Sequence, residues 1–209
     1  MGKLLYIEAS PRGERSRSST VAKAFIEAYK KAHPGDTVEK VNVFDAKLAT
    51  LDLPTLGAKY AVLHGKEPTT AELKRWKPVQ AVMDQFKAAD KYVISTPMWN
   101  FSIPYRLKHY IDLLVNPGQT FSYSPKEGYK GLVTGKPIML VCARGGEYPE
   151  GTAGAALDMQ TAYLKLILGF IGFTDIRWIL VEPTLAGPDV ADEKTKAAVE
   201  RAKQQAKTF

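Results

Sequence analysis

The sequence has little of the chemistry on which disulfide and metal proteins depend. Cysteine occurs once in 209 residues, at Cys142 within an apolar run, so a disulfide framework is excluded and a buried thiol is the simplest interpretation. The three histidines, His33, His64 and His109, show no pairing at the spacing of metal ligands. We therefore expect no metal site, and the sequence offers no evident base partner that would make Cys142 a nucleophile.

Long hydrophobic runs and blocks of like charge are also missing. No apolar stretch approaches the roughly 20 residues of a membrane span, and the N-terminal run is too short for a signal peptide. The net charge is +7, but basic and acidic residues are mixed along the chain, which is typical of solvated helix faces rather than of a nucleic-acid surface. These features predict a cytoplasmic protein that binds neither nucleic acid nor membrane.

Apolar runs alternate with segments of helical periodicity along the whole chain. Five strands are expected, over residues 3–9, 38–43, 91–96, 138–143 and 175–182. Helices are expected over 21–32, 71–88, 103–114 and 153–170, with a short helix near 54–64 and a last helix after Pro188. Residues 116–136, rich in Gly, Pro, Ser and Tyr, are expected to form a long excursion from the regular elements. This alternation predicts one α/β domain over residues 1–209, a three-layer, doubly wound sheet of five parallel strands.

In such a sheet, ligands bind beyond the carboxyl ends of the strands, where the strand order reverses. The loop after the first strand leads directly into a helix, and it carries Ser10, Ser16, Arg17 and Ser18. Hydroxyls, a guanidinium and the free N–H groups of a helix N-terminus together suit a phosphate dianion. The alternative is that Ser16 or Ser18 only caps the helix.

The loop after the third strand is unusually rich in flat side chains. It reads Pro97-Met98-Trp99-Asn100-Phe101. The aromatic faces suit a planar ligand, and the Asn100 amide can donate to and accept from the edge of a heterocycle. The alternative is an ordinary strand-to-helix turn whose aromatic side chains pack in the core.

After the fourth strand come Ala143-Arg144-Gly145-Gly146. Two glycines allow backbone N–H groups to approach a ring closely, although Gly-Gly also serves any tight turn. Phosphate at the first loop and a flat heterocycle at the other two describe a mononucleotide with an extended ring. FMN fits this description.

These residues resemble the FMN-dependent NADH:quinone oxidoreductases, also called azoreductases, over nearly the whole chain. The resemblance is carried by Ser10 with 16–18, and by residues 97–101, 107–108, 120–123, 131–136, 144–146 and 168–172. It implies a flavodoxin-like fold and a homodimer with two active sites at the subunit interface. In that family the first loop would hold the FMN phosphate, 97–101 would line the isoalloxazine, and 143–146 would meet its pyrimidine side. Phe121, Tyr123 and Tyr148 are then expected on the substrate side.

The resemblance implies that NADH or NADPH reduces FMN and that quinones or azo compounds reoxidise it, in a ping-pong cycle that needs no catalytic side chain. Three positions depart from the family. Trp99 stands where the family commonly has Tyr, Ala143 where it commonly has Ser or Thr, and Glu147-Tyr148 where some members have a His. The alternative of a flavodoxin-like electron carrier is disfavoured because flavodoxins are acidic and this chain is basic. A hydrolase of phosphopantetheine-type esters is also disfavoured, because it would need a metal site or an activated nucleophile and the sequence shows neither. Because the first loop is rich in arginine, we also hypothesise that Arg12 or Arg15 favours NADPH.

Overall fold

The molecule is built on a parallel sheet with the strand order β2-β1-β3-β6-β7. The computed structural model describes the backbone of residues 1–209 and every side chain except that of Val62. The five strands are β1 (Lys3–Glu8), β2 (Thr37–Asn42), β3 (Lys91–Pro97), β6 (Pro137–Ala143) and β7 (Asp175–Val181). All four neighbouring pairs are parallel, which confirms the predicted sheet. The order reverses between β1 and β3.

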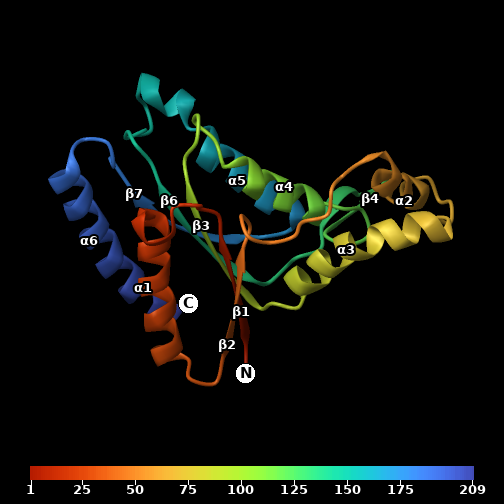
Figure 1. Cartoon of the computed structure of the whole chain (residues 1–209), viewed down its shortest axis with the longest axis horizontal. Coiled ribbons are helices and arrows are strands. Elements are labelled where there is room, and N and C mark those ends of the chain that lie inside the picture. Colours follow the sequence, from red (N-terminus) through yellow and green to blue (C-terminus); the bar gives the residue numbers. More distant parts are fainter.

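Helices cover both faces of this sheet, as Figure 1 shows. One face carries α1 (Arg17–Ala32) and α6 (Pro188–Gln205), and the other carries α3 (Thr70–Lys87), α4 (Tyr105–Leu114) and α5 (Met159–Ile171). Successive side chains of a strand point to opposite faces of the sheet. Leu4 and Tyr6 therefore pack in the core under α1 and α6, while Leu5 and Ile7 pack in the core under α3, α4 and α5. The three predicted layers are thus confirmed. Helix α2 (Leu53–Leu63) packs against α3 at one end of the molecule.

The excursion expected over residues 116–136 contains an antiparallel hairpin of β4 (Phe121–Ser124) and β5 (Gly128–Gly131). One local prediction is wrong. Residues 153–170 do not form one helix. A short 3₁₀ turn over Ala153–Leu157 comes first, and α5 begins after Asp158, whose carboxylate accepts a hydrogen bond from the Thr161 N–H at 2.9 Å. That cap fixes the start of α5 close to the carboxyl edge of the sheet.

The hairpin is held tightly against the C-terminal end of α5. The Val133 N–H donates to the Ile171 carbonyl at 2.8 Å. A Cβ on Gly131 would lie 2.3 Å from the Gly172 nitrogen, so only glycine permits this approach. The aromatic rings of Phe121, Tyr129 and Phe170 pack together at the same place. The hairpin is therefore a fixed extension of the domain.

No helix in the described part of the chain is both long enough and apolar enough to cross a membrane.

Candidate functional site

A cavity of about 290 Å³ opens at the carboxyl edge of the sheet, between the loops that follow β1, β3 and β6. Of the residues predicted for the site, it brings together Ser10, Ser16, Arg17, Ser18, Pro97, Met98, Trp99, Ala143 and Gly145. It also includes Arg12, Thr184 and Leu185. The cavity lies at the carboxyl ends of β1 and β3, the two strands between which the strand order reverses, as expected for ligand sites in sheets of this kind.

The wall formed by the first loop is rich in buried hydroxyl groups. Ser10, Ser16 and Ser18 are 2%, 3% and 0% exposed. Ser16 caps α1, since its Oγ accepts from the Ser19 N–H at 3.3 Å, and it lies 3.3 Å from the Ser18 Oγ. Capping alone uses one serine, so Ser10 and Ser18 call for another explanation. Together with the positive end of the α1 dipole, these hydroxyls suit a phosphate dianion.

The Arg17 guanidinium does not point at these serines. It donates to the Asp192 carboxylate at 2.7 Å and to the Thr195 hydroxyl at 3.0 Å, both on α6. Its side chain therefore ties α1 to α6. What remains for an anion at this position is the backbone N–H in the first turn of the helix.

The second wall is a tight turn. The N–H of Trp99 donates to the Ser102 carbonyl at 2.9 Å, and the reverse bond is 3.0 Å long. The two residues between them, Asn100 and Phe101, have φ of +47° and +67°, the signature of a type I′ turn. Asparagine tolerates this region, whereas phenylalanine adopts it at an expense of about 1–3 kcal/mol. Such strain is found at functional sites more often than elsewhere.

The turn directs its two aromatic residues differently. Trp99 is half-buried at the cavity and meets Phe44 edge-on at 5.8 Å. Phe101 is 46% exposed and meets the Tyr148 ring at 6.4 Å. Neither Asn100 nor Phe101 lines the cavity within the described residues. Pro97, Met98 and Trp99 are therefore the flat apolar wall of this chain's own cavity.

The third loop is anchored by backbone hydrogen bonds rather than by side chains in the cavity. The Met98 N–H donates to the Ala143 carbonyl at 2.8 Å, which joins the second and third loops. The Thr184 N–H and hydroxyl both donate to the Arg144 carbonyl, and the Leu185 N–H donates to that of Gly145. The loop after β7 thereby becomes part of the site. Gly146 and Tyr148 lie outside the cavity lining in the part of the chain that the structure describes.

Arg144 is turned inward and is only 2% exposed. Its Nε donates to Glu182 at 2.7 Å, its Nη1 donates to Asp158, and it lies over the Tyr148 ring. Burial raises the pKa of Asp158, but hydrogen bonds from Thr161 and Arg144 outweigh it and hold that pKa below its ordinary value. The guanidinium therefore fixes the loop after β6 to the starts of α5 and of the loop after β7. It is not directed at the cavity.

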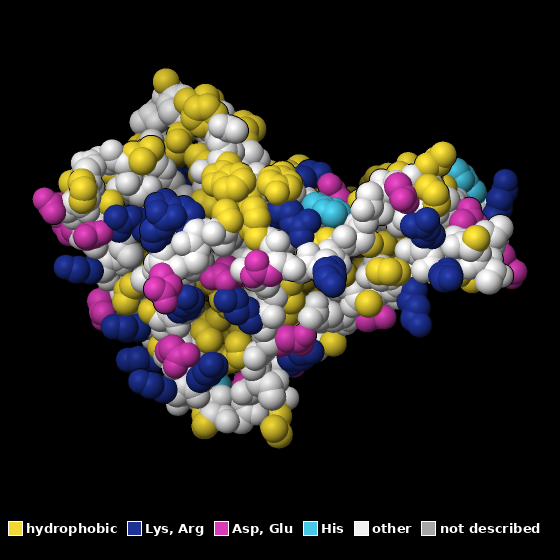
Figure 2. Space-filling view, in the orientation of Figure 1, with side chains coloured by type: hydrophobic (Ala, Val, Ile, Leu, Met, Phe, Trp, Pro, Cys, Tyr) yellow, Lys and Arg dark blue, Asp and Glu magenta, His cyan; other side chains and the backbone are white. Residues whose placement is uncertain are grey.

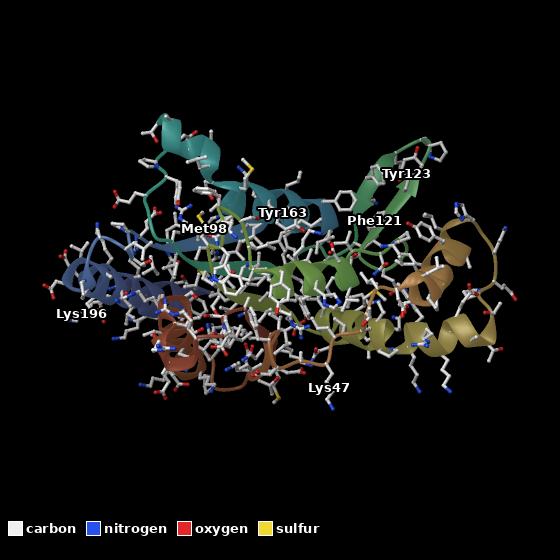
Figure 3. The ribbon with its side chains drawn as sticks, turned by 45° about the horizontal axis from the view of Figure 1, so that its top comes forward. Lys47, Met98, Phe121, Tyr123, Tyr163 and Lys196 are labelled. Carbon is white, nitrogen blue, oxygen red and sulfur yellow. The ribbon has the colours of Figure 1, made fainter. Side chains whose placement is uncertain are left out.

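The two hairpin residues predicted for the substrate side lie away from this chain's cavity. In Figure 3, Phe121 and Tyr123 lie well apart from Met98, on the other side of the middle of the molecule. Figure 1 also places β4 near α2 and α3. One chain by itself does not bring these residues together with the cavity.

The described residues contain no group of three or more His, Cys, Asp or Glu side chains that could hold a metal ion. The Cys142 thiol is buried, as predicted, and burial raises its pKa to about 12. A thiol with that pKa is a poor nucleophile at neutral pH.

Arg12, Thr184 and Leu185 were not predicted as residues of this cavity. Arg12 had been singled out only for NADPH. The other two follow the fifth strand, which ends at the same edge of the sheet as β1, β3 and β6. The loop after β7 was not expected in the site because β7 does not lie where the strand order reverses. Its carboxyl end nevertheless lies on the same side of the sheet as those of the other parallel strands.

Comparison with known proteins places this cavity in context. A family model described as a flavodoxin-like fold matches residues 2–206. An FMN-dependent NADH:quinone oxidoreductase of Nitratidesulfovibrio vulgaris is 52% identical over the full length of both chains. One from Desulfotalea psychrophila is 50% identical over 88% of this chain and 87% of its own.

Solved structures agree with these relatives. An azoreductase from Bacillus anthracis is similar with a TM-score of 0.90 and 35% identity, over 100% of each chain. An FMN-dependent NADH-azoreductase from the same species, crystallised in complex with FMN, has a TM-score of 0.85 and 31% identity, over 99% of this chain and 100% of its own.

Proposed function

This chain belongs to the family of flavodoxin-like FMN-dependent NADH:quinone oxidoreductases, and from that membership we propose that it is an enzyme that uses NADH or NADPH to reduce quinones and azo compounds through bound FMN. The observation that carries this proposal is the cavity that joins a hydroxyl-lined helix N-terminus to a flat apolar wall. We place the enzyme in the cytoplasm, where reduced nicotinamide cofactors are available. Recovery in the membrane fraction of lysed cells would contradict that location.

The residues present fit FMN. The nearly buried hydroxyls of Ser10, Ser16 and Ser18, in the loop after β1 and at the start of α1, match a phosphate, because each can still donate a hydrogen bond to an anion. Met98 and Trp99 offer an apolar surface to a planar ring. At about 290 Å³, the cavity is at the low end of small-molecule pockets and open to solvent on one side. A cavity of this size would enclose only part of the cofactor and would leave one face open to a second flat molecule.

When bound, FMN supplies the hydride chemistry, accepting from reduced nicotinamide and delivering to the acceptor. The chain contributes binding and orientation. Ser10, Ser16 and Ser18 hold the phosphate end, and the Pro97–Trp99 wall sets the plane of the ring. Glycine is needed at position 145 because Leu185 already occupies the space a side chain would need, with its Cδ1 2.6 Å from a Cβ built there.

Because the cavity is open on one side only, the electron donor and the electron acceptor would bind at the same position, one after the other. Such an order of binding is a ping-pong mechanism. Initial rates with NADH varied at several fixed quinone concentrations should give parallel double-reciprocal lines. Intersecting lines would show that both substrates bind together and would exclude a shared position.

We further propose that the enzyme is a homodimer in which the hairpin of one chain covers the cavity of its partner. Phe121 and Tyr123 do not reach the cavity of their own chain (Figure 3). Large apolar side chains are also exposed on α4, α5 and the hairpin, namely Tyr105, Tyr123, Tyr129, Met159 and Leu166. Neighbouring exposed apolar residues of this kind mark protein interfaces.

A charge placed on this surface tests the dimer. Leu166 is 71% exposed on α5, so Leu166→Glu should leave each chain folded but convert a dimer into monomers in sedimentation velocity. Val190→Glu, on α6 across the sheet, is the matched control and should remain dimeric. A monomeric wild-type protein at tens of micromolar would contradict the proposed assembly.

A further inference from the structure

A second cavity, of about 500 Å³, adjoins the first on the side of α6. It lies between the 3₁₀ turn Gly13–Arg15, the start of α1 and the first turns of α6. Arg12 and Arg17 line both cavities, so the two are neighbours. None of the residues of the flat wall lines the second cavity within the described chain.

This second cavity is surrounded by more positive charge than negative. Arg17 is neutralised by its ion pair with Asp192 at 2.7 Å. Arg12, Arg15 and Lys196 also line it, and none of them has a carboxylate within 4.0 Å among the described residues. The remaining acid is Glu14. Figure 2 shows Lys and Arg gathered over the N-terminal end of α1 beside α6, and Figure 3 places Lys196 on that helix.

Three cations without a carboxylate partner around one hollow favour an anion of high charge density. A phosphate monoester carries about −1.5 to −2 at pH 7, and arginine binds phosphate oxygens in bidentate geometry. A nucleotide base and sugar also need room beside the phosphate, and the cavity provides it.

We propose that this basic cavity binds the 2′-phosphate of NADPH, so that the enzyme uses NADPH in preference to NADH. The inference rests on the proposed function. Because the two cavities share Arg12 and Arg17, a donor whose nicotinamide lay at the open face beside Met98 and Trp99 would place its adenosine end in the second cavity by extending past the loop after β1.

Kinetics with both donors test the assignment. The wild-type FMN-loaded enzyme should have a kcat/KM for NADPH at least about tenfold above that for NADH. Arg15→Ala and Lys196→Ala should each lower the NADPH value by about tenfold, the loss expected for a charged hydrogen-bonding partner, and leave the NADH value within about twofold. Both side chains are exposed, so these variants are expected to fold. Lys207→Ala removes the same charge just beyond the C-terminal end of α6, away from the first turns that line the cavity, and should change neither value.

Binding without turnover gives a second readout. Adenosine 2′,5′-bisphosphate should bind the loaded enzyme at least about tenfold more tightly than adenosine 5′-monophosphate in calorimetry, and Arg15→Ala should remove that difference. Equal use of both donors, or equal losses for both in the variants, would overturn the assignment while leaving the flavoenzyme intact. A protein that retains no FMN would instead overturn the proposed function, and this inference with it.

Discussion

Substitution of Ser16 by aspartate is expected to lower the affinity for FMN by about a hundredfold or more without unfolding the protein. Ser16 caps α1 and is 3% exposed beside Ser10 and Ser18, the hydroxyls proposed to hold the phosphate. Aspartate is as good an N-cap as serine, so the helix keeps its start. The new carboxylate, however, stands where the structure offers its hydroxyls to a dianion, and like charges at close range are repelled by several kcal/mol.

Two controls separate charge from shape. Ser16→Asn also caps the helix but adds no charge, and it should bind FMN within about tenfold of the wild type. Riboflavin lacks the phosphate, so Ser16→Asp should bind it as well as the wild type does. Quenching of flavin fluorescence on binding measures all five affinities. If Ser16→Asp lost FMN and riboflavin equally, the phosphate would lie elsewhere.

Loss of the Arg144 guanidinium is expected to destabilise the fold by about 3–5 kcal/mol, the usual penalty for breaking a buried ion pair from one side. In Arg144→Ala, Asp158 and Glu182 would both lose their partner at 11% and 19% side-chain exposure. Because Asp158 also caps α5, the start of that helix should loosen with the loop. Urea unfolding followed by far-ultraviolet circular dichroism measures the change.

Arg177→Ala is the matched comparison for Arg144. Arg177 also pairs with an acid, Asp175 on β7, but the two side chains are 36% and 45% exposed. An exposed pair is worth about 0–1 kcal/mol, so this variant should unfold at nearly the wild-type urea concentration. Similar losses in the two variants would mean that burial of the Arg144 cluster contributes little. FMN affinity should fall only in Arg144→Ala, whose loop forms one wall of the cavity.

The features of the chain that repeat locally could be predicted from its sequence. Apolar runs such as Leu4-Leu5 and Ile138–Cys142 alternate with helical periodicity, and the parallel sheet, its layers and the family resemblance are all confirmed. Three of the loops around the cavity, those after β1, β3 and β6, are the ones named from the strand order, whereas the loop after β7 with Thr184 and Leu185 was not expected there. Roles for individual side chains within those loops remain proposals.

Pairings between distant residues could not be predicted in this way. Arg17 lies 175 positions from Asp192, and Arg144 lies 38 from Glu182, and no local pattern records which charge will meet which. Both guanidiniums looked like ligand donors in the sequence, whereas the structure commits them to carboxylates. The positive φ of Phe101 was equally hidden, because phenylalanine rarely adopts it.

The visible absorption spectrum of the purified protein, recorded before and after NADH addition under argon, tests the central claim most directly. The account predicts two flavin bands that bleach with NADH and return on addition of a quinone, and FMN rather than FAD in the heat-released pigment. A colourless protein that binds no added FMN would contradict it, because the cavity at the carboxyl edge of the sheet would then serve some other anion.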